Sequence, residues 1–245
     1  MVNRDRAWRA GTPCWVEIAV DDQDAAVAFY SALFDWDVGD GTCRLGGRIV
    51  AGIGPRRPGV PVGWLTYLAT GHTAASADEI ALSDGTVLVP PFDVPGARAV
   101  VAADPAGAVF GVWEARGHLG FEVANEVGTV CWNEHLSSAS EDAKEFYGTV
   151  FAHTFTAAAD PVPYAVDYAM TSLHGRVIGG LASTPAEEPA RWASHVLVAD
   201  CEAAAAAVTD LGGTVRRPPA DTTYGRIAQV ADDQGAEFTI IAGTP

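Results

Sequence analysis

The chain has 245 residues, with 49% hydrophobic residues, 19% charged residues and a formal net charge of −16 at pH 7. This length allows one large core or two ordinary ones, and the composition is that of a globular protein. A surface this acidic, with no basic stripe, excludes nucleic acid and anionic membranes as expected partners. No apolar run approaches the roughly 20 residues that span a bilayer, and residues 1–10 lack the apolar segment of a signal peptide. We therefore expect a cytoplasmic protein.

The sequence of residues 11–34 (GTPCWVEIAVDDQDAAVAFYSALF) returns in altered form at residues 128–151 (GTVCWNEHLSSASEDAKEFYGTVF). Each copy reads as a strand followed by a helix whose apolar residues recur at helical spacing. The aligned positions are Cys14 and Cys131, Trp15 and Trp132, Glu17 and Glu134, Tyr30 and Tyr147, and Phe34 and Phe151. The repeated cysteines show no CxxC spacing, which favours buried thiols over disulfides or zinc ligands.

A second internal alignment starts at Trp64 and Trp192. It places Arg98 on Arg226, Asp104 on Asp232, and Phe110 on Phe238. The chain therefore reads as four strand–helix–strand–strand–strand modules paired two by two, an α+β fold. We expect an N-terminal extension over 1–10, a first domain over 11–120 (modules 11–58 and 61–120), and a second domain over 121–245 (modules 128–185 and 189–243).

The first strand alternates cleanly, which separates its two faces. Val16 and Ile18 point toward the helix, whereas Trp15 and Glu17 point to the opposite, uncovered face. Each module is expected to form one sheet, and pairing two modules curls the sheets into a half-closed barrel with an internal cavity. Pro90-Pro91 is expected to be a turn, and Gly179-Gly180 a turn or a bulge.

This pattern resembles the vicinal oxygen chelate (VOC) superfamily, which includes glyoxalase I, bleomycin-resistance proteins and extradiol dioxygenases. The resemblance is carried by the helix segments ending in FYxxxF at 21–34 and 140–151, and by the DPxG-A-x-F strand at 104–110, echoed at 232–238. It covers about residues 11 to 243. The combination CWxE, FYxxxF and GxWE is similar to a tandem two-domain actinobacterial branch, whose members are labelled glyoxalase-like or hydroxylase. Some of these members belong to antibiotic or polyketide pathways.

The resemblance also implies where a metal would bind. The family takes a His or Gln from the first strand of each module and a Glu from the last. Carried over to this chain, the ligand positions fall on Trp15, Leu65 and Gly111 in the first domain and on Trp132, Ala193 and Thr239 in the second. These side chains cannot ligate a divalent cation as such a site requires. We therefore expect no metal, no cofactor, and neither glyoxalase I nor ring-cleaving dioxygenase activity.

Polar residues return one position further along the same cavity face. Glu17 should face Tyr67 in the first half, and Glu134 should face His195 in the second. A carboxylate and an imidazole in an apolar pocket form a candidate acid/base pair, with Glu134 as base and His195 as acid or oxyanion partner. The alternative is that both glutamates are structural, each accepting hydrogen bonds inside its barrel.

Aromatic and basic side chains are the candidate ligand contacts. Trp15, Trp132 and Trp113 should wall the cavity and stack on a flat ligand, or simply fill the core. Arg98 and Arg226 either bind a ligand anion or pair with an acid such as Asp104. Trp64 and Trp192 are predicted to lie in the helix-side core. His135 stands where an apolar residue is expected and has no explanation from the sequence, and the remaining histidines, His72, His118, His153 and His174, are expected on the surface.

Three functions fit these residues. We expect a metal-independent, small-molecule protein that acts by acid/base chemistry on an aromatic or polyketide-like metabolite. One alternative is a non-catalytic drug-binding protein of the bleomycin-resistance kind, for which an acidic protein suits a cationic drug. The other is a metal-dependent glyoxalase or dioxygenase with Glu134 and His195 as improvised ligands. The partner is a small molecule in each case, and the chain is expected to be a monomer or homodimer.

Overall fold

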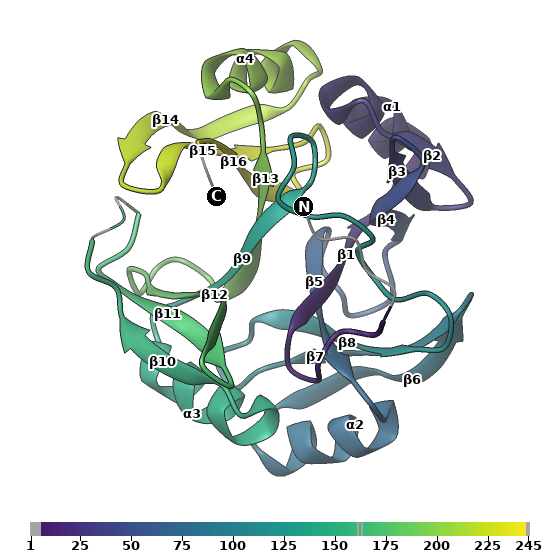
Figure 1. Ribbon diagram of the computed structural model, residues 1–245, viewed down its shortest axis with the longest axis vertical. Helices are drawn as coiled ribbons and strands as arrows, with labels where there is room; N and C mark the ends of the chain where they lie inside the picture. Colours follow the sequence, from purple (N-terminus) through teal and green to yellow (C-terminus); the bar gives the residue numbers. More distant parts are fainter. Residues whose placement is uncertain (1–5, 161, 163, 244–245) are drawn as a thin grey trace.

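A computed structural model describes residues 6–160, 162 and 164–243 of the chain. Within these residues, four βαβββ modules follow one another (Figure 1). The first contains β1 (Pro13–Val20), α1 (Gln23–Phe34), β2 (Asp37–Gly39), β3 (Thr42–Leu45) and β4 (Arg48–Pro55). The second contains β5 (Gly63–Thr70), α2 (Thr73–Leu82), β6 (Thr86–Val94), β7 (Ala97–Ala103) and β8 (Val109–Ala115).

The third and fourth modules repeat the same order of elements. The third contains β9 (Val130–Ser137), α3 (Ser140–Phe151), β10 (Thr154–Ala157), β11 (Asp167–Leu173) and β12 (Arg176–Ser183). The fourth contains β13 (Arg191–Leu197), α4 (Cys201–Asp210), β14 (Thr214–Thr222), β15 (Gly225–Ala231) and β16 (Glu237–Ala242).

Two modules share one continuous sheet, whereas the sequence predicts one sheet for each module. The strand orders are β2-β3-β4-β1-β5-β8-β7-β6 and β10-β11-β12-β9-β13-β16-β15-β14. β1 pairs in parallel with β4 and antiparallel with β5, so the β1–β5 pair joins the two modules. β9 pairs in the same way with β12 and β13. The predicted fold class, four βαβββ modules in two half-barrels, is confirmed.

The helices start where acidic side chains cap their first free amides. Asp22 accepts a hydrogen bond from the amide of Ala25 at 3.0 Å, and Asp200 from the amide of Ala203 at 2.9 Å. Figure 1 shows α1 beside α4 at one end of the molecule and α2 beside α3 at the other. Each helix therefore packs next to a helix of the other domain, and the open faces of the sheets point away from these contacts.

The two domains share their helix-side cores. Trp64 and Tyr30 of the first domain pack against Phe238 of the second, with ring centroids 5.2 and 5.8 Å apart respectively. Phe110 packs against Tyr147 in the same way, at 5.6 Å. Residues of module four therefore join modules one and two in one core, and residues of module three join module two in another. The prediction that Trp64 and Trp192 lie in the helix-side core is confirmed.

A buried tyrosine from each domain donates a hydrogen bond to a buried aspartate of the other. The Tyr30 hydroxyl donates to Oδ2 of Asp232 at 2.9 Å and accepts from the Trp64 indole, also at 2.9 Å. The Oδ1 atom of Asp232 accepts from the amide of Ala236 at 2.8 Å, which fixes the turn that carries it. The tyrosine of the FY motif in one domain thus forms a hydrogen bond with the aspartate in a turn of the other domain.

The second copy of this contact explains His135. The Tyr147 hydroxyl donates to Oδ2 of Asp104 at 3.1 Å and accepts from the Trp192 indole at 2.8 Å. Nε2 of His135 lies 2.7 Å from the same aspartate oxygen. His135 is therefore a buried third partner of Asp104, at the position that Ile18 occupies in the other copy.

The paired prolines lie inside strands instead of forming turns. Pro90-Pro91 belongs to β6 and Pro218-Pro219 to β14, the outermost strands of the two sheets. Proline has no amide hydrogen to donate, so it is tolerated at a sheet edge and at bulges. Register shifts in both strands occur at these prolines.

His153 is buried, where the sequence analysis expects a surface residue. Its Nε2 lies 2.7 Å from the carbonyl oxygen of Gly11, just before β1, and it follows α3 of the other domain. Because its burial disfavours the charged imidazolium, the pKa of His153 is lowered to about 4. This contact ties the N-terminal segment to the second domain.

The two tyrosine contacts predict unequal losses of stability. Tyr30→Phe leaves Oδ2 of Asp232 without a described partner, whereas after Tyr147→Phe the Asp104 oxygen keeps His135. We expect losses of about 2–3 and about 1–2 kcal/mol in the free energy of unfolding respectively, since a buried group without a hydrogen bond carries its full desolvation cost. Urea denaturation of both variants measures this, and equal losses would contradict the assignment.

His153 predicts a pH dependence of stability. Its folded-state pKa of about 4 lies below the ordinary 6.5, so the unfolded chain binds the proton first as pH falls. The free energy of unfolding should therefore decrease from about pH 6.5 to about pH 4, by about 3 kcal/mol at most. His153→Gln should show a shallower slope in this window than the wild-type protein, and His174→Asn, at an exposed turn, the same slope. Parallel slopes for the wild type and His153→Gln would refute the assignment.

Candidate functional site

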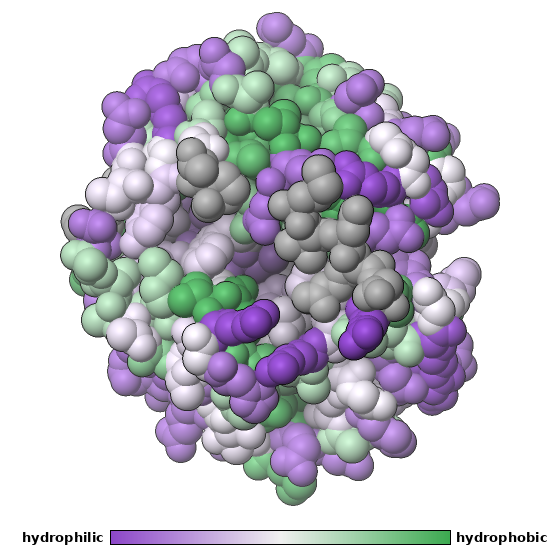
Figure 2. Space-filling view, viewed as in Figure 1, coloured by the Kyte–Doolittle hydropathy of each residue, from purple (hydrophilic) through white to green (hydrophobic). Residues whose placement is uncertain are grey.

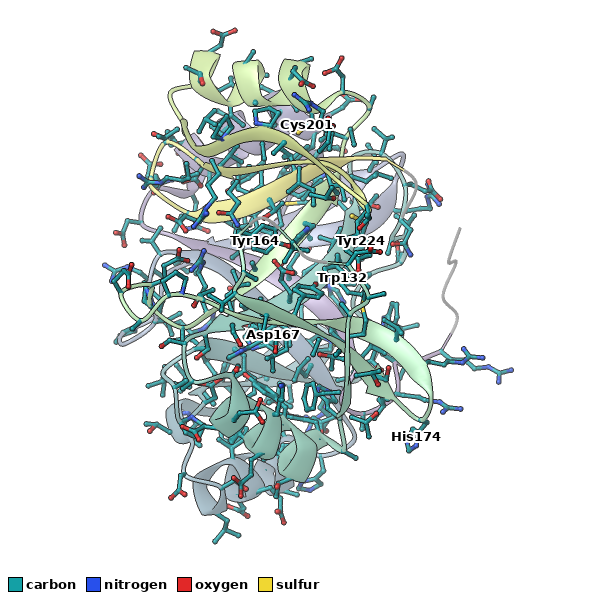
Figure 3. The ribbon with its side chains drawn as sticks, turned by 90° about the vertical axis from the view of Figure 1, so that its left-hand side faces the viewer. Trp132, Tyr164, Asp167, His174, Cys201 and Tyr224 are labelled. Carbon is teal, nitrogen blue, oxygen red and sulfur yellow. The ribbon has the colours of Figure 1, made fainter. Side chains whose placement is uncertain are left out.

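A pocket of about 820 Å³ occupies the open face of the second domain. Figure 2 shows this face of the molecule hollowed left of its centre, and Figure 3 shows Trp132, Tyr164 and Tyr224 gathered in the middle of the domain. The walls are mostly aromatic and aliphatic. Trp8 and Phe121 line the pocket from outside the second sheet, so the N-terminal segment and the segment between the domains complete it.

Glu134 and His195 lie at the inner wall of this pocket. Their strands β9 and β13 pair so that Trp132 lies opposite His195, which places Glu134 diagonally on the same face. Oε1 of Glu134 lies 3.0 Å from Nε2 of His195, and the side chains are 0% and 3% exposed. The two residues thus face one another as the sequence predicts. His195 borders the pocket, whereas Glu134 lies behind it.

Two tyrosines that no sequence motif predicts hold Glu134 in place. The hydroxyls of Tyr164 and Tyr168 donate to Oε2 of Glu134 at 3.1 and 2.8 Å. Burial, with the nearby Glu134 charge second, raises the pKa of both phenols, which therefore remain protonated donors. The Trp132 indole in turn donates to the Tyr168 hydroxyl at 2.9 Å. A pocket wall is thus linked to the carboxylate through one tyrosine.

The glycine pair in β12 makes room for this arrangement. Gly179-Gly180 lies within the strand, not at a turn. A Cβ on Gly180 would lie 2.0 Å from the Tyr168 hydroxyl oxygen and 3.2 Å from the Trp132 indole nitrogen. Only glycine at position 180 leaves room for the Tyr168 hydroxyl to reach Glu134 across the sheet. No pattern in the sequence predicts this contact.

The equivalent face of the first domain is filled by its own side chains. Trp15 and Trp113 pack at 5.8 Å, and His118 lies on them at 4.7 and 5.1 Å between ring centroids. His118 is therefore half-buried in this cluster, where the sequence predicts a surface residue, and burial lowers its pKa. The interpretation of Trp15 and Trp113 as core-filling residues fits this packing, whereas Trp132 borders open space.

Glu17 has different partners from Glu134. The Tyr67 hydroxyl donates to it at 2.8 Å, which is the predicted pair, and Arg57 forms an ion pair with it at 3.0 Å. The Tyr67 ring lies over Gly111, where a Cβ would approach it to 2.0 Å. The first-domain carboxylate is thus neutralised by an arginine and closed off by a tyrosine.

Arg98 and Arg226 lie away from the pocket. Arg98 lies 3.7 Å from Asp93 on the neighbouring edge strand, and not beside Asp104. Arg226 pairs with Asp221 at 2.9 Å and with Glu202. Both arginines therefore have surface ion-pair partners, and neither lines the cavity.

The residues at the pocket do not fit the metal of the superfamily. The inherited ligand positions hold Trp132, Ala193 and Thr239, and among residues 6–160, 162 and 164–243 no group of three His, Cys, Asp or Glu side chains could hold an ion. Cys131 is a free thiol whose pKa burial raises to about 12, so it adds no thiolate ligand. Glu134 and His195 alone supply two donors where such a site needs at least three.

Comparisons with known proteins agree with the fold. No family model matches the chain. CFP32 of Mycobacterium tuberculosis (strain CDC 1551 / Oshkosh), named a glyoxylase, is 34% identical over 97% of both chains. The anthracycline biosynthesis protein DnrV of Streptomyces peucetius is 32% identical over 94% of this chain and 93% of its own.

Among solved structures, the Mn(II)-bound glyoxalase of Novosphingobium aromaticivorans aligns with a TM-score of 0.65 at 14% identity, over 97% of this chain and 83% of that one. The 2,3-dioxygenase LapB of Pseudomonas sp. KL28 aligns with a TM-score of 0.63 at 13% identity, over 97% and 94%. The fold and the open, curved sheets define a two-domain vicinal oxygen chelate protein. The chain belongs to this superfamily, together with CFP32 and DnrV.

Gly180 provides a direct test of the tyrosine contact. Gly180→Ala should displace the Tyr168 hydroxyl from Glu134 and lower the free energy of unfolding by about 1–3 kcal/mol, because the added methyl overlaps an ordered side chain. Gly39→Ala is the matched control, since no atom lies within 4 Å of its added Cβ, and should change stability by less than about 0.5 kcal/mol. Equal stabilities of the two variants in urea denaturation would exclude a close contact at Gly180.

Proposed function

We propose that the protein is an enzyme that binds a flat aromatic metabolite in the second domain and transfers a proton with His195. The observation that carries this proposal is the buried Glu134–His195 pair at 3.0 Å, at the wall of a pocket of about 820 Å³. A pocket of this volume suits a ligand of several fused rings. The name of the relative DnrV, an anthracycline biosynthesis protein, supports a polycyclic aromatic substrate.

We propose the two roles in a different order from the sequence analysis, because only one of the two residues borders the pocket. His195 borders the pocket and can touch a ligand, so the imidazole is the proposed acid/base group. Glu134 is 0% exposed and lies behind it, so the carboxylate orients the ring and stabilises the imidazolium that forms. Such a pair can remove a proton beside a carbonyl and return it to another atom, as in isomerisation, elimination or hydration.

The same residues favour chemistry without a metal. The donor set does not fit a metal site, and each oxygen of Glu134 already faces a protein group, either a tyrosine hydroxyl or His195. We therefore propose that proton transfer, and not Lewis-acid activation, is the chemistry of this pocket. The first domain, closed by its own tryptophans and by Arg57, serves as a scaffold that completes the pocket wall.

A second candidate function is sequestration of an aromatic drug. It is favoured by the predominance of aromatic and aliphatic side chains in the lining, since stacking alone can hold a flat molecule. In this case Glu134 and His195 would only shape the pocket. Recovery of the bound compound chemically unaltered would support this candidate over the enzyme.

The experiment starts with thermal stabilisation of the full chain against a panel of aromatic polyketides, with and without divalent metal ions. Ligand at 100 times its Kd should add about 2.7 kcal/mol of stability. Compounds that stabilise are then incubated with the protein and assayed for conversion. His195→Ala should lower kcat by about 10²–10⁴-fold, and Glu134→Gln by a smaller factor, because a general acid/base contributes in this range.

Surface substitutions of the same kind are the controls. Glu141→Gln and His174→Asn change exposed residues and should leave kcat within about twofold of the wild type. Unchanged turnover in both His195→Ala and Glu134→Gln would end the assignment. Stabilisation or turnover that requires added metal would show that the metal-free mechanism is wrong.

A further inference from the structure

We propose that the second-domain pocket selects an uncharged ring system that donates a hydrogen bond from a hydroxyl group to Nδ1 of His195, and that it rejects anions. This inference rests on the proposed function, because it concerns the same pocket. It follows from two features of the site, namely the charges along the wall and the position of the proton on His195.

Among the residues that the structure describes, none of those lining the pocket carries a fixed charge. None of the residues that line it is an arginine, lysine, aspartate or glutamate. The phenols of Tyr164 and Tyr168 stay neutral because burial raises their pKa values, and the Cys131 thiol stays neutral because burial raises its pKa to about 12. Arg9 follows the lining residue Trp8, and Arg176 precedes the lining residue Val177. Both arginine side chains are exposed, and neither lines the cavity.

Apart from His195, whose Nε2 faces Glu134, the described lining residues therefore offer an anion no basic side chain to pair with. A buried charge without a partner costs several kcal/mol. Glu134 lies 3.0 Å from His195 behind the inner wall, and its negative charge adds repulsion. The first domain shows the contrast, because Glu17 is neutralised by Arg57 at 3.0 Å, whereas no arginine or lysine is described beside Glu134.

The contacts of Glu134 place a proton on Nε2 of His195. Both tyrosine hydroxyls donate to Oε2, so neither supplies a proton to Oε1. Oε1 faces Nε2 at 3.0 Å, and neither atom has a hydrogen-bond partner among the described residues, so the two atoms are in close approach without an aligned hydrogen bond. A carboxylate oxygen and an unprotonated imidazole nitrogen at this distance repel one another, so the neutral ring carries its proton on Nε2.

This tautomer leaves a lone pair on Nδ1. The structure assigns Nδ1 no hydrogen bond to a described residue, and His195 borders the pocket. A bound molecule therefore fits best when it donates a hydrogen bond to Nδ1, for example from a phenolic or enolic hydroxyl. The rest of the bound molecule should be flat, because it would stack on the aromatic side chains of the wall, which are Trp132, Tyr224, Trp8 and Phe121.

The test compares three probes with one ring system, namely hydroxyanthracene, methoxyanthracene and anthracene carboxylate substituted at the same position. Binding to the full chain is followed by quenching of tryptophan fluorescence, to which Trp132 and Trp8 in the wall contribute. The methoxy probe should bind about tenfold more weakly than the hydroxy probe, because it cannot donate to Nδ1. The carboxylate should bind about a hundredfold more weakly. In His195→Phe the preference for the hydroxy over the methoxy probe should disappear.

Nitrogen NMR of the imidazole gives a second readout that needs no ligand. At a pH where His195 is neutral, its spectrum should show a protonated Nε2 and an unprotonated Nδ1, assigned by comparison with His195→Phe. Glu134→Gln should weaken this tautomer preference, and Glu141→Gln should leave it unchanged. A protonated Nδ1 in the wild type would overturn the inference.

The outcomes separate this inference from the proposed function. Equal binding of the hydroxy and methoxy probes, or tight binding of the carboxylate, would refute the selectivity while leaving proton transfer by His195 open to the turnover assay. The expected selectivity and tautomer, together with no conversion of any stabilising compound, would refute the enzyme and leave the binding inference standing.

Discussion

The reciprocal tyrosine–aspartate contacts organise the whole molecule. Tyr30 donates to Asp232, and Tyr147 donates to Asp104, so each domain supplies the donor for one contact and the acceptor for the other. These buried groups require partners, and they find them only when the helix-covered sides of the two sheets meet. The open faces must then point outward, which makes them available for a pocket.

The duplication places equivalent residues on the open faces of the two sheets, and the two faces differ because of a few side chains. Trp15 packs against Trp113 and His118, so the first face is filled, whereas Trp132 is turned toward Tyr168 and borders open space. Glycines decide both outcomes locally, because Gly111 admits the Tyr67 ring and Gly180 admits the Tyr168 hydroxyl. One scaffold thus carries one closed site and one open site.

The two repeated glutamates occupy equivalent positions of the duplication, but their neighbouring charged and polar groups differ. Glu17 faces an arginine, which holds its charge in an ion pair. Glu134 instead accepts hydrogen bonds from two phenols and faces an imidazole at 3.0 Å. The difference between a carboxylate held in an ion pair and one that faces an imidazole and two phenols therefore lies in the neighbours and not in the glutamate itself.

The sequence by itself determined the repeats, the four modules and the pairs Glu17–Tyr67 and Glu134–His195, because strand alternation and helix spacing report which face a residue occupies. It placed Trp64 and Trp192 in the core for the same reason. It could not find Tyr164, Tyr168 or Arg57, since Tyr168 reaches Glu134 from a strand distant in sequence, and Tyr164 and Arg57 reach the glutamates from segments outside the strands. Nor could it explain His135, whose partner Asp104 belongs to the other domain. The open pocket, the closed first face and the role of Gly180 were decided only by tertiary packing, because volume and register arise when the strands meet.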